Sequence, residues 1–294
     1  MIQGALTAMI TPFAHGQVDF ARLKAQVKFQ IAQGIDGLVP VGTTGESPTL
    51  SHEEHRAVIE TVVAAAGDAR RKVPVIPGTG SNATSEALDL TAHARQVGAD
   101  ASLQVVPYYN KPTQEGLYRH FMTLADRVDL PLILYNIPGR CGVALTPATV
   151  ARLARHPNII GIKEATGSLD VASEIAATCP RHFIILSGDD SLTLPIMSVG
   201  GRGVISVLSN LIPRQVAALT HAALDGDWTK ARKLHLNLLP LFRGMFVETN
   251  PIPIKTAMAL AGRDSGEMRL PLCPLLPANH KTLAELLRRQ GILR

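Results

Sequence analysis

The sequence predicts an α/β fold, a closed (β/α)8 barrel followed by a C-terminal helical extension. Between residues 5 and 224, eight short apolar segments alternate with longer amphipathic segments. This alternation indicates a parallel sheet, because each return crossover between parallel strands needs a helix. Eight units in about 225 residues match the size of a closed TIM barrel. An open doubly wound sheet would alternate in the same way, but no G-x-G-x-x-G follows the first strand.

Each predicted strand is a short apolar run that is bounded by turn-forming residues. The first run begins near the amino terminus and ends at Thr11 and Pro12, so it reads as a strand rather than as a signal peptide. The eight predicted strands are Ala5–Ile10, Gly37–Val41, Val73–Pro77, Ala101–Val106, Leu130–Tyr135, Ile159–Lys163, Phe183–Ser187 and Gly203–Val207.

The segments between the strands have helical spacing. In the first of them Leu23, Val27 and Ile31 recur four residues apart, which places them on one helix face. The second opens with Ser51-His52-Glu53-Glu54, the pattern of a capping box. The predicted helices of the barrel are Phe20–Ala32, Ser51–Ala66, Thr84–Val97, Gln114–Arg127, Thr146–Arg155, Leu169–Thr178, Leu192–Val199 and Pro213–Leu224.

The strand pattern stops after about Asp225. Trp228–Phe246, Ile254–Ala261 and Asn279–Gln290 read as helices, and proline-rich stretches separate them. We therefore divide the chain into a catalytic barrel, residues 1–224, and a C-terminal helical region, residues 225–294.

Composition excludes several classes of protein. Hydrophobic residues make up 46% of the 294 residues and charged residues 18%, so the chain can bury a large core. The formal net charge is +5, but the basic residues are scattered and only 4% of residues are aromatic, so we expect no nucleic-acid partner. No apolar run approaches the roughly 18 residues that span a membrane. Three widely spaced cysteines without a C-x-x-C pair fit a reducing cytoplasm.

A metal site is not expected. His52 and His55 lie three residues apart on one helix, which suits metal ligands. However, no third histidine or carboxylate is clearly placed to complete such a site. The pair Asp189-Asp190 reads instead as a helix N-cap followed by an acid in the first turn.

Polar residues gather where the predicted strands end, and in a barrel the carboxyl ends of the strands form the active face. Three of the four tyrosines in the chain lie on this rim. The rim segments are Gly42-Thr43-Thr44-Gly45-Glu46-Ser47, Gly78-Thr79-Gly80-Ser81-Asn82, Pro107-Tyr108-Tyr109-Asn110, Tyr135-Asn136-Ile137-Pro138-Gly139-Arg140 and Gly188-Asp189-Asp190.

Lys163 is the most informative residue of the predicted strands. Strand alternation places Gly161, Lys163 and Ala165 on one face, and the small neighbours leave room beside the ammonium group. A desolvated lysine has a lowered pKa and can attack a ketone. The alternative is a structural lysine that is paired with Glu164 or Asp189.

Other rim residues have two interpretations each. Gly42-Thr43-Thr44-Gly45 is either a tight turn or a site that holds a carboxylate with its hydroxyl and N–H groups. Tyr108, Tyr109 and Tyr135 either pack as half-buried aromatics or transfer protons. Arg140 is either a solvated surface residue or a ligand for a substrate carboxylate.

Taken together, four motifs resemble the dihydrodipicolinate synthase family of class I pyruvate-dependent aldolases and lyases. The resemblance covers essentially the whole chain, including Glu248–Lys255. The motifs are Gly42-Thr43-Thr44-Gly45-Glu46, Pro107-Tyr108-Tyr109-Asn110-Lys111-Pro112, Tyr135-Asn136-Ile137-Pro138 and Gly161-Ile162-Lys163-Glu164-Ala165.

The resemblance implies roles for the rim residues. Lys163 would form the Schiff base with pyruvate. Tyr135 would transfer protons to and from solvent through Thr43 and Tyr109. In the family this Tyr109 comes from a neighbouring subunit, which implies a homotetramer. The groups that would contact the substrates are Thr44, Ile205, Gly188 and, for the carboxylate of L-aspartate 4-semialdehyde, Arg140. No cofactor is expected, because the lysine itself provides the electron sink.

The family carboligation yields 4-hydroxy-tetrahydrodipicolinate, in the diaminopimelate route to lysine. An alternative within the superfamily is a pyruvate-releasing aldolase that acts on sugar acids. Arg140 favours the synthase, although the family commonly has Ser and Thr where this chain has Gly139 and Cys141. A barrel without activity, acting as a binding protein, is a third possibility.

A regulatory site for L-lysine is also implied by the resemblance. Glu86 would pair with the ammonium group of the bound lysine, and Asn82 and Tyr108 would hold its carboxylate. Pro48 replaces the usual alanine. The implied set is Ser47, His52, His55, Asn82, Glu86 and Tyr108.

Overall fold

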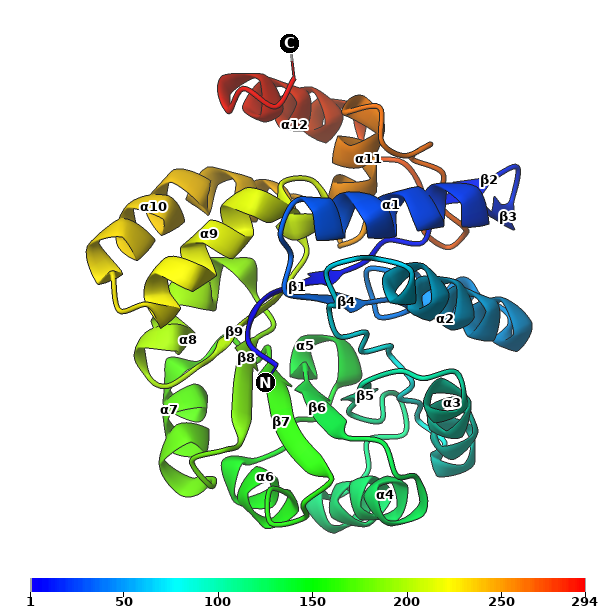
Figure 1. The fold of residues 1–294 in the computed structure, drawn as a ribbon, viewed down its shortest axis with the longest axis vertical. Coiled ribbons are helices and arrows are strands. Elements are labelled where there is room, and N and C mark those ends of the chain that lie inside the picture. Colours follow the sequence, from blue (N-terminus) through cyan, green and yellow to red (C-terminus); the bar gives the residue numbers. More distant parts are fainter. Residues whose placement is uncertain (1, 294) are drawn as a thin grey trace.

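The computed structural model describes residues 2–293. Seven parallel strands form one curled sheet in the order β4-β1-β9-β8-β7-β6-β5, and helices surround it (Figure 1). This is the predicted (β/α)8 barrel. The strands are β1 (Gly4–Ala8), β4 (Gly37–Val39), β5 (Ser102–Val105), β6 (Leu132–Asn136), β7 (Ile159–Glu164), β8 (Ile184–Ser187) and β9 (Gly203–Ser206).

The third predicted strand, Val73–Pro77, closes the barrel without forming a regular strand. It is joined to its neighbours by single bridges, Leu38 to Val75 and Gly78 to Leu103. Pro74 and Pro77 supply only carbonyls to these pairings, because proline has no N–H to donate. Two hydrogen bonds therefore run into this segment from the neighbouring strands, Leu38 N to Pro74 O (2.9 Å) and Leu103 N to Pro77 O (2.8 Å).

The helices fall close to the predicted bounds. Ser51 begins α2 with the expected capping box. The short helix α5, which carries Arg140, and the hairpin of β2 (Phe13–Ala14) and β3 (Gln17–Val18) were not predicted. The barrel helices are α1 (Phe20–Ala32), α2 (His52–Gly67), α3 (Thr84–Gln96), α4 (Gln114–Arg127), α5 (Pro138–Cys141), α6 (Pro147–Leu153), α7 (Leu169–Thr178), α8 (Thr193–Ser198) and α9 (Pro213–Leu224).

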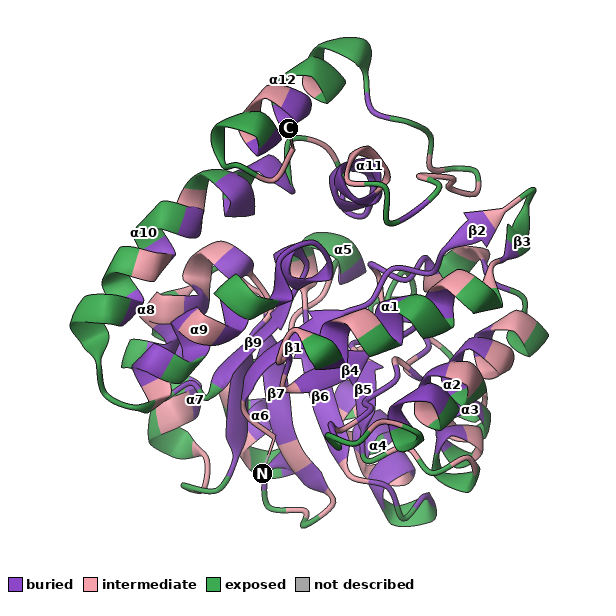
Figure 2. Cartoon of the chain, turned by 45° about the horizontal axis from the view of Figure 1, so that its top comes forward, coloured by how far each residue is buried: buried purple, intermediate pink, exposed green. Residues whose placement is uncertain are grey.

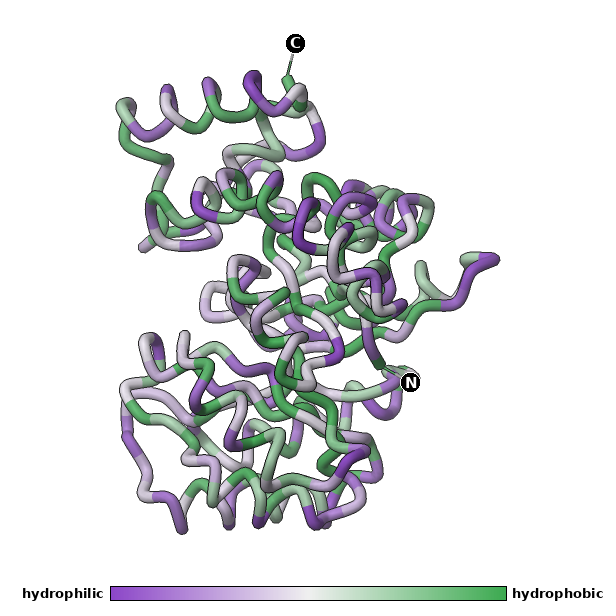
Figure 3. The backbone as a smooth tube through the Cα atoms, turned by 90° about the vertical axis from the view of Figure 1, so that its left-hand side faces the viewer, coloured by the Kyte–Doolittle hydropathy of each residue, from purple (hydrophilic) through white to green (hydrophobic). Residues whose placement is uncertain are grey.

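The core has two layers. Inside the barrel, alternate residues of the strands form one cluster that includes Leu6, Ile133, Tyr135, Leu186 and Ile205. The other strand residues pack outward against the apolar faces of the helices. Figure 2 shows the barrel strands mostly buried, with exposed residues on the outer faces of the helices. The hydropathy alternates along the helices accordingly (Figure 3).

Three helices follow the barrel: α10 (Trp228–Gly244), α11 (Ile252–Leu260) and α12 (Pro277–Arg289). Helix α10 packs on α9, and α12 packs on α10 and α11. Helices α11 and α12 lie beyond α1 at one side of the barrel (Figure 1). No helix within residues 2–293 is both long and apolar enough to cross a membrane.

Candidate active site

Lys163 lies near the end of β7, inside the barrel. It is paired in register with Tyr135 of β6 and Leu186 of β8, and only 6% of it is exposed. The room beside it comes from Gly188, where a Cβ atom would lie 3.2 Å from Lys163 Cε. Gly161 contributes differently from our expectation, because a Cβ atom there would lie 2.5 Å from the Ile184 carbonyl oxygen. Gly161 therefore allows β8 to approach, whereas Gly188 leaves space at the amine.

The environment of Lys163 favours the neutral amine. Burial lowers the pKa of its ammonium group to about 7, and the positive charge of Arg140 acts in the same direction. The negative charge of Asp190 opposes this shift. A large share of Lys163 is therefore unprotonated at neutral pH, as a nucleophilic amine must be.

Tyr135 lies directly beside this amine. The centre of its ring is 4.1 Å from Lys163 Nζ, and the side chain is buried. Burial raises the pKa of the phenol to about 12, while the adjacent Thr43 side chain acts in the opposite direction. The phenol is thus protonated at neutral pH and next to a group that can share its proton. The pair suits proton transfer at a carbon bound to Lys163.

The turn after β4 contains Thr43 and Thr44. Thr44 is buried, and its Oγ1 accepts a hydrogen bond of 3.0 Å from Asn250 Nδ2. Gly45 is required here, because a Cβ atom would lie 3.0 Å from Val41 N and 3.1 Å from Met9 O. The turn is tight and Thr44 is held in place, so its geometry is compatible both with a simple turn and with a site that holds a carboxylate.

Arg140 extends from α5 at the edge of the site. Its guanidinium group is held by the Asn250 carbonyl oxygen, which accepts a hydrogen bond of 3.0 Å from Nη2. The side chain is exposed, as a ligand for an incoming carboxylate needs to be. Ile205 lies in the barrel cluster that also contains Tyr135.

Tyr109 does not join the other residues within one chain. It is 89% exposed, and its backbone has a φ of 71°, in the left-handed region that is uncommon for a tyrosine. The ring of Tyr109 therefore does not pack against its own barrel.

Two residues of the site were missed from the sequence. Asp189 caps the following turn as expected, with Oδ1 accepting from Ser191 N at 2.8 Å. Asp190, however, is fully buried, and its Oδ2 accepts from Val207 N (2.9 Å) and Leu208 N (3.0 Å). Burial raises its pKa to about 6. Asn250 was quoted within a motif, but no sequence pattern indicated that it contacts Thr44.

A cavity of about 440 Å³ is lined by Tyr135 and by residues of α2 and α3. Thr43 and Arg140 line this cavity together with Tyr135. Most residues of the implied lysine site line the same cavity: Ser47, His52, His55, Glu86 and Tyr108. Asn82 is outside the lining, but its Nδ2 donates to the Tyr108 carbonyl oxygen at 3.2 Å. Lys163 is not part of the lining either.

Glu86 is the acidic group of this cavity. His52 Nε2 lies 2.7 Å from Glu86 Oε1, and the Ser81 hydroxyl donates to Oε2. His55 is buried, and desolvation lowers its pKa to about 4, so it is neutral at pH 7. The cavity therefore offers one carboxylate to a cationic ligand. Within residues 2–293, no group of three or more His, Cys, Asp or Glu side chains is arranged to hold a metal ion.

Comparison with known proteins identifies the family. The sequence model of the Dihydrodipicolinate synthetase family matches residues 1–290. The chain belongs to this family. A 4-hydroxy-tetrahydrodipicolinate synthase from Geobacter metallireducens is 53% identical over 293 residues, which is 100% of both chains.

Solved structures of family members have the same fold. The chloride-inhibited dihydrodipicolinate synthase of Acinetobacter baumannii, complexed with pyruvate, is 42% identical with a TM-score of 0.97 and covers 100% of both chains. The enzyme from Cyanidioschyzon merolae, solved with lysine bound, is 39% identical with a TM-score of 0.96 over 99% of both chains. Membership of the dihydrodipicolinate synthetase family thus agrees with the expectation from the four motifs.

Proposed function

We propose that this chain condenses pyruvate with L-aspartate 4-semialdehyde to give 4-hydroxy-tetrahydrodipicolinate, on the diaminopimelate route to lysine. The observation that carries the proposal is the buried amine of Lys163, which has a pKa near 7 and lies 4.1 Å from the Tyr135 ring. Full-length relatives with this activity in their names favour the synthase over a sugar-acid aldolase. The proposal assigns catalysis to Lys163, Tyr135, Thr43 and Tyr109.

The reaction begins when the Lys163 amine attacks the pyruvate carbonyl carbon and water leaves, which produces an iminium. The positive nitrogen acidifies the methyl group, and Tyr135 relays the released proton as the enamine forms. The enamine carbon then attacks the aldehyde of the second substrate. The amino group of that substrate displaces Lys163, closes the ring and regenerates the enzyme.

The remaining site residues would bind the substrates. Thr44, fixed by Asn250, is suited to the pyruvate carboxylate, with Ile205 and Gly188 shaping the space around it. Arg140 would hold the carboxylate of the semialdehyde through charge-assisted hydrogen bonds. Its place in the cavity lining, with the guanidinium group hydrogen-bonded to the Asn250 carbonyl oxygen, supports this assignment.

One experiment tests the proposal. The protein is incubated with pyruvate, reduced with borohydride and mapped by mass spectrometry, and we expect an adduct on Lys163. Aspartate semialdehyde and sugar acids are then compared as substrates. Absence of the adduct would exclude both aldolase-type activities, and turnover of sugar acids alone would exclude the synthase.

The rate of adduct formation should depend on pH. Because the Lys163 pKa is about 7, lowering the pH below 7 protonates the amine and lowers the rate about tenfold per pH unit. Above about pH 8 the amine is largely unprotonated, and the rate should level off. Quenched-flow trapping at subsaturating pyruvate measures this profile. A rate of adduct formation that stays constant between about pH 5.5 and 8 would contradict the assigned pKa of Lys163.

We propose that L-lysine inhibits the enzyme by binding to Ser47, His52, His55, Asn82, Glu86 and Tyr108. A relative solved with lysine bound and the Glu86 carboxylate in the cavity lining support this proposal. Glu86→Gln should weaken inhibition about tenfold or more, because a charged hydrogen bond to the ligand ammonium is lost. Glu60→Gln is the matched control, since Glu60 pairs with His93 on the same two helices. Equal inhibition of both variants would contradict the proposed site.

We further propose a cytoplasmic homotetramer, a dimer of dimers, in which Tyr109 of one subunit completes the site of another. The 89% exposure of this tyrosine in the single chain supports that role. Residues 1–224 would form the catalytic barrel and residues 225–294 a helical region. Sedimentation velocity on the purified protein reports the oligomeric state directly.

A further inference from the structure

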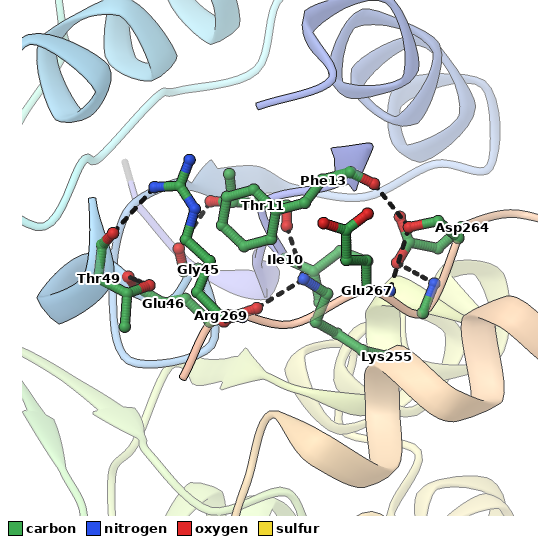
Figure 4. A network of polar contacts seen from close by, with 12 residues as sticks. Ile10, Thr11, Phe13, Gly45, Glu46, Thr49, Lys255, Asp264, Glu267 and Arg269 are labelled. Carbon is green, nitrogen blue, oxygen red and sulfur yellow. Dashed lines mark hydrogen bonds and ion pairs between the residues drawn. The ribbon is translucent and has the colours of Figure 1, made fainter. Parts of the chain in front are cut away.

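A buried ion pair joins the helices after the barrel to the turn that carries Thr43 and Thr44 (Figure 4). Lys255 of α11 and Glu46 of the turn both have side chains with no exposed surface, and Nζ lies 2.5 Å from Oε1. Lys255 Nζ also donates to the Thr11 carbonyl oxygen at 2.9 Å and lies 4.3 Å from the centre of the Phe13 ring. The ammonium group is thus held in a fixed position.

The second carboxylate oxygen of Glu46 is held from the same region of the chain. Arg269 N donates to Oε2 at 3.1 Å, and the Arg269 guanidinium group donates to the Thr49 carbonyl oxygen at 2.9 Å. Glu46 itself has a left-handed φ of 53°, which costs free energy for a residue with a Cβ atom. Such a conformation persists because the contacts on both carboxylate oxygens require it.

A second connection reaches the same turn. Asn250, two residues before α11, donates to Thr44 Oγ1. The segment from Asn250 to Lys255 therefore holds the turn at Thr44 and again at Glu46. Both positions lie within three residues of Thr43, whose side chain adjoins Tyr135.

Stability alone does not require charges at these positions. A buried ion pair can often be replaced by apolar residues of similar size without loss of stability, because desolvation offsets the attraction between the charges. The pair does provide direction, since both carboxylate oxygens of Glu46 have a hydrogen-bond donor and the Lys255 ammonium group donates to two fixed acceptors. The geometry points to a role in orientation rather than in stability.

We propose that Glu46 and Lys255 are positioning residues for the condensation. They act through Thr44, by fixing the turn so that its hydroxyl faces pyruvate bound to Lys163. This inference rests on the proposed function and deepens it. Neither residue touches the substrate in this scheme.

The test uses Glu46→Gln, Lys255→Met and the double variant in the full chain. We measure the pyruvate concentration that gives half-maximal borohydride trapping on Lys163, and KM for pyruvate. Each single change should raise both values about tenfold or more, because small displacements of binding groups have large effects. The double variant should regain thermal stability, since no unpaired buried charge remains, but should keep the raised KM. A double variant with the KM of the original protein would overturn the inference.

Arg263→Met is the matched control. Arg263 also ties the C-terminal region to the barrel, through the Leu211 carbonyl oxygen and the Phe29 ring, but it does not contact the turn. It should lower Tm without a change in KM for pyruvate. An equal rise of KM in Arg263→Met and Lys255→Met would overturn the inference.

A Thr44→Val background tests the route of action. If Glu46 acts through Thr44, Glu46→Gln should raise KM much less in that background, whereas independent effects would multiply. Full multiplication of the two fold-changes would overturn the inference. Its failure is distinct from that of the proposed function, which is overturned when the original protein forms no adduct with pyruvate.

Discussion

Lys163→Met should abolish the borohydride-trapped pyruvate adduct and lower kcat/KM by about 10⁴-fold or more, as loss of a catalytic nucleophile does. Methionine fills a similar volume without a nucleophilic nitrogen, and the site already disfavours a charge, because burial lowers the Lys163 pKa to about 7. The variant should therefore fold as well as the original protein. Mass spectrometry of the reduced adduct and a steady-state assay measure the two effects.

Lys233→Met is the matched control, because Lys233 is exposed on α10 and far along the chain from the barrel strands. It should form the adduct at the normal rate. Lys163→Arg keeps a positive charge but is not expected to form an imine, since guanidinium remains protonated. An adduct of normal yield in Lys163→Met would show that another amine is the nucleophile.

The fold could be predicted because the barrel depends on local patterns. Apolar runs of strand length and four-residue spacing in helices are set by which faces are buried, and both are visible in the sequence. The segment Val73–Pro77 shows the limit of this reasoning. Its apolar character predicted a strand, but its two prolines restrict it to single bridges.

The position of Lys163 could also be predicted, because strand alternation decides which way a side chain faces. The reason for the free space beside it could not. Gly161 precedes Lys163 by two residues, yet it is Gly188, directly after the next strand, that leaves room at Cε. Contacts between strands depend on register, and register is fixed by the closed sheet.

Contacts between residues that are far apart in the sequence could not be predicted from local patterns. Asp190 adjoins Asp189 in sequence, but only the backbone N–H groups of Val207 and Leu208 reveal that one of these acids is buried. Asn250 meets Thr44 across 206 positions, and Lys255 meets Glu46 across 209. No periodicity encodes such pairings, because they arise when α11 docks against the barrel.

At neutral pH the Tyr135 phenol is protonated, whereas a large share of the Lys163 amine is unprotonated. Burial favours the neutral form of each group, so it lowers the pKa of Lys163 and raises the pKa of Tyr135. The result is an amine that can attack next to a phenol that can donate. The same burial thus lowers the pKa of the nucleophile and raises the pKa of the acid, so no separate group is needed to shift each pKa.

Tyr135→Phe should separate these two roles. The phenyl ring would keep the packing beside Lys163, so pyruvate should still be trapped on the amine with a half-saturating concentration within about threefold of normal. Proton transfer would lose its relay, and kcat should fall about 10²- to 10⁴-fold, the usual contribution of a positioned acid or base. Steady-state kinetics measures kcat, and NMR in deuterated water measures exchange of the pyruvate methyl protons, which reports enamine formation.

Tyr118→Phe is the control, since Tyr118 lies on α4 under the Arg152 guanidinium group, away from the cavity that reaches Tyr135. It should leave both kcat and exchange unchanged. In Tyr135→Phe, methyl exchange should slow by a factor close to that for kcat, because removal of the methyl proton is the step that the phenol serves. Normal exchange combined with a low kcat would instead assign Tyr135 to the later condensation. Normal values of both would leave the phenol with packing alone and would transfer proton removal to another group near the Lys163 amine.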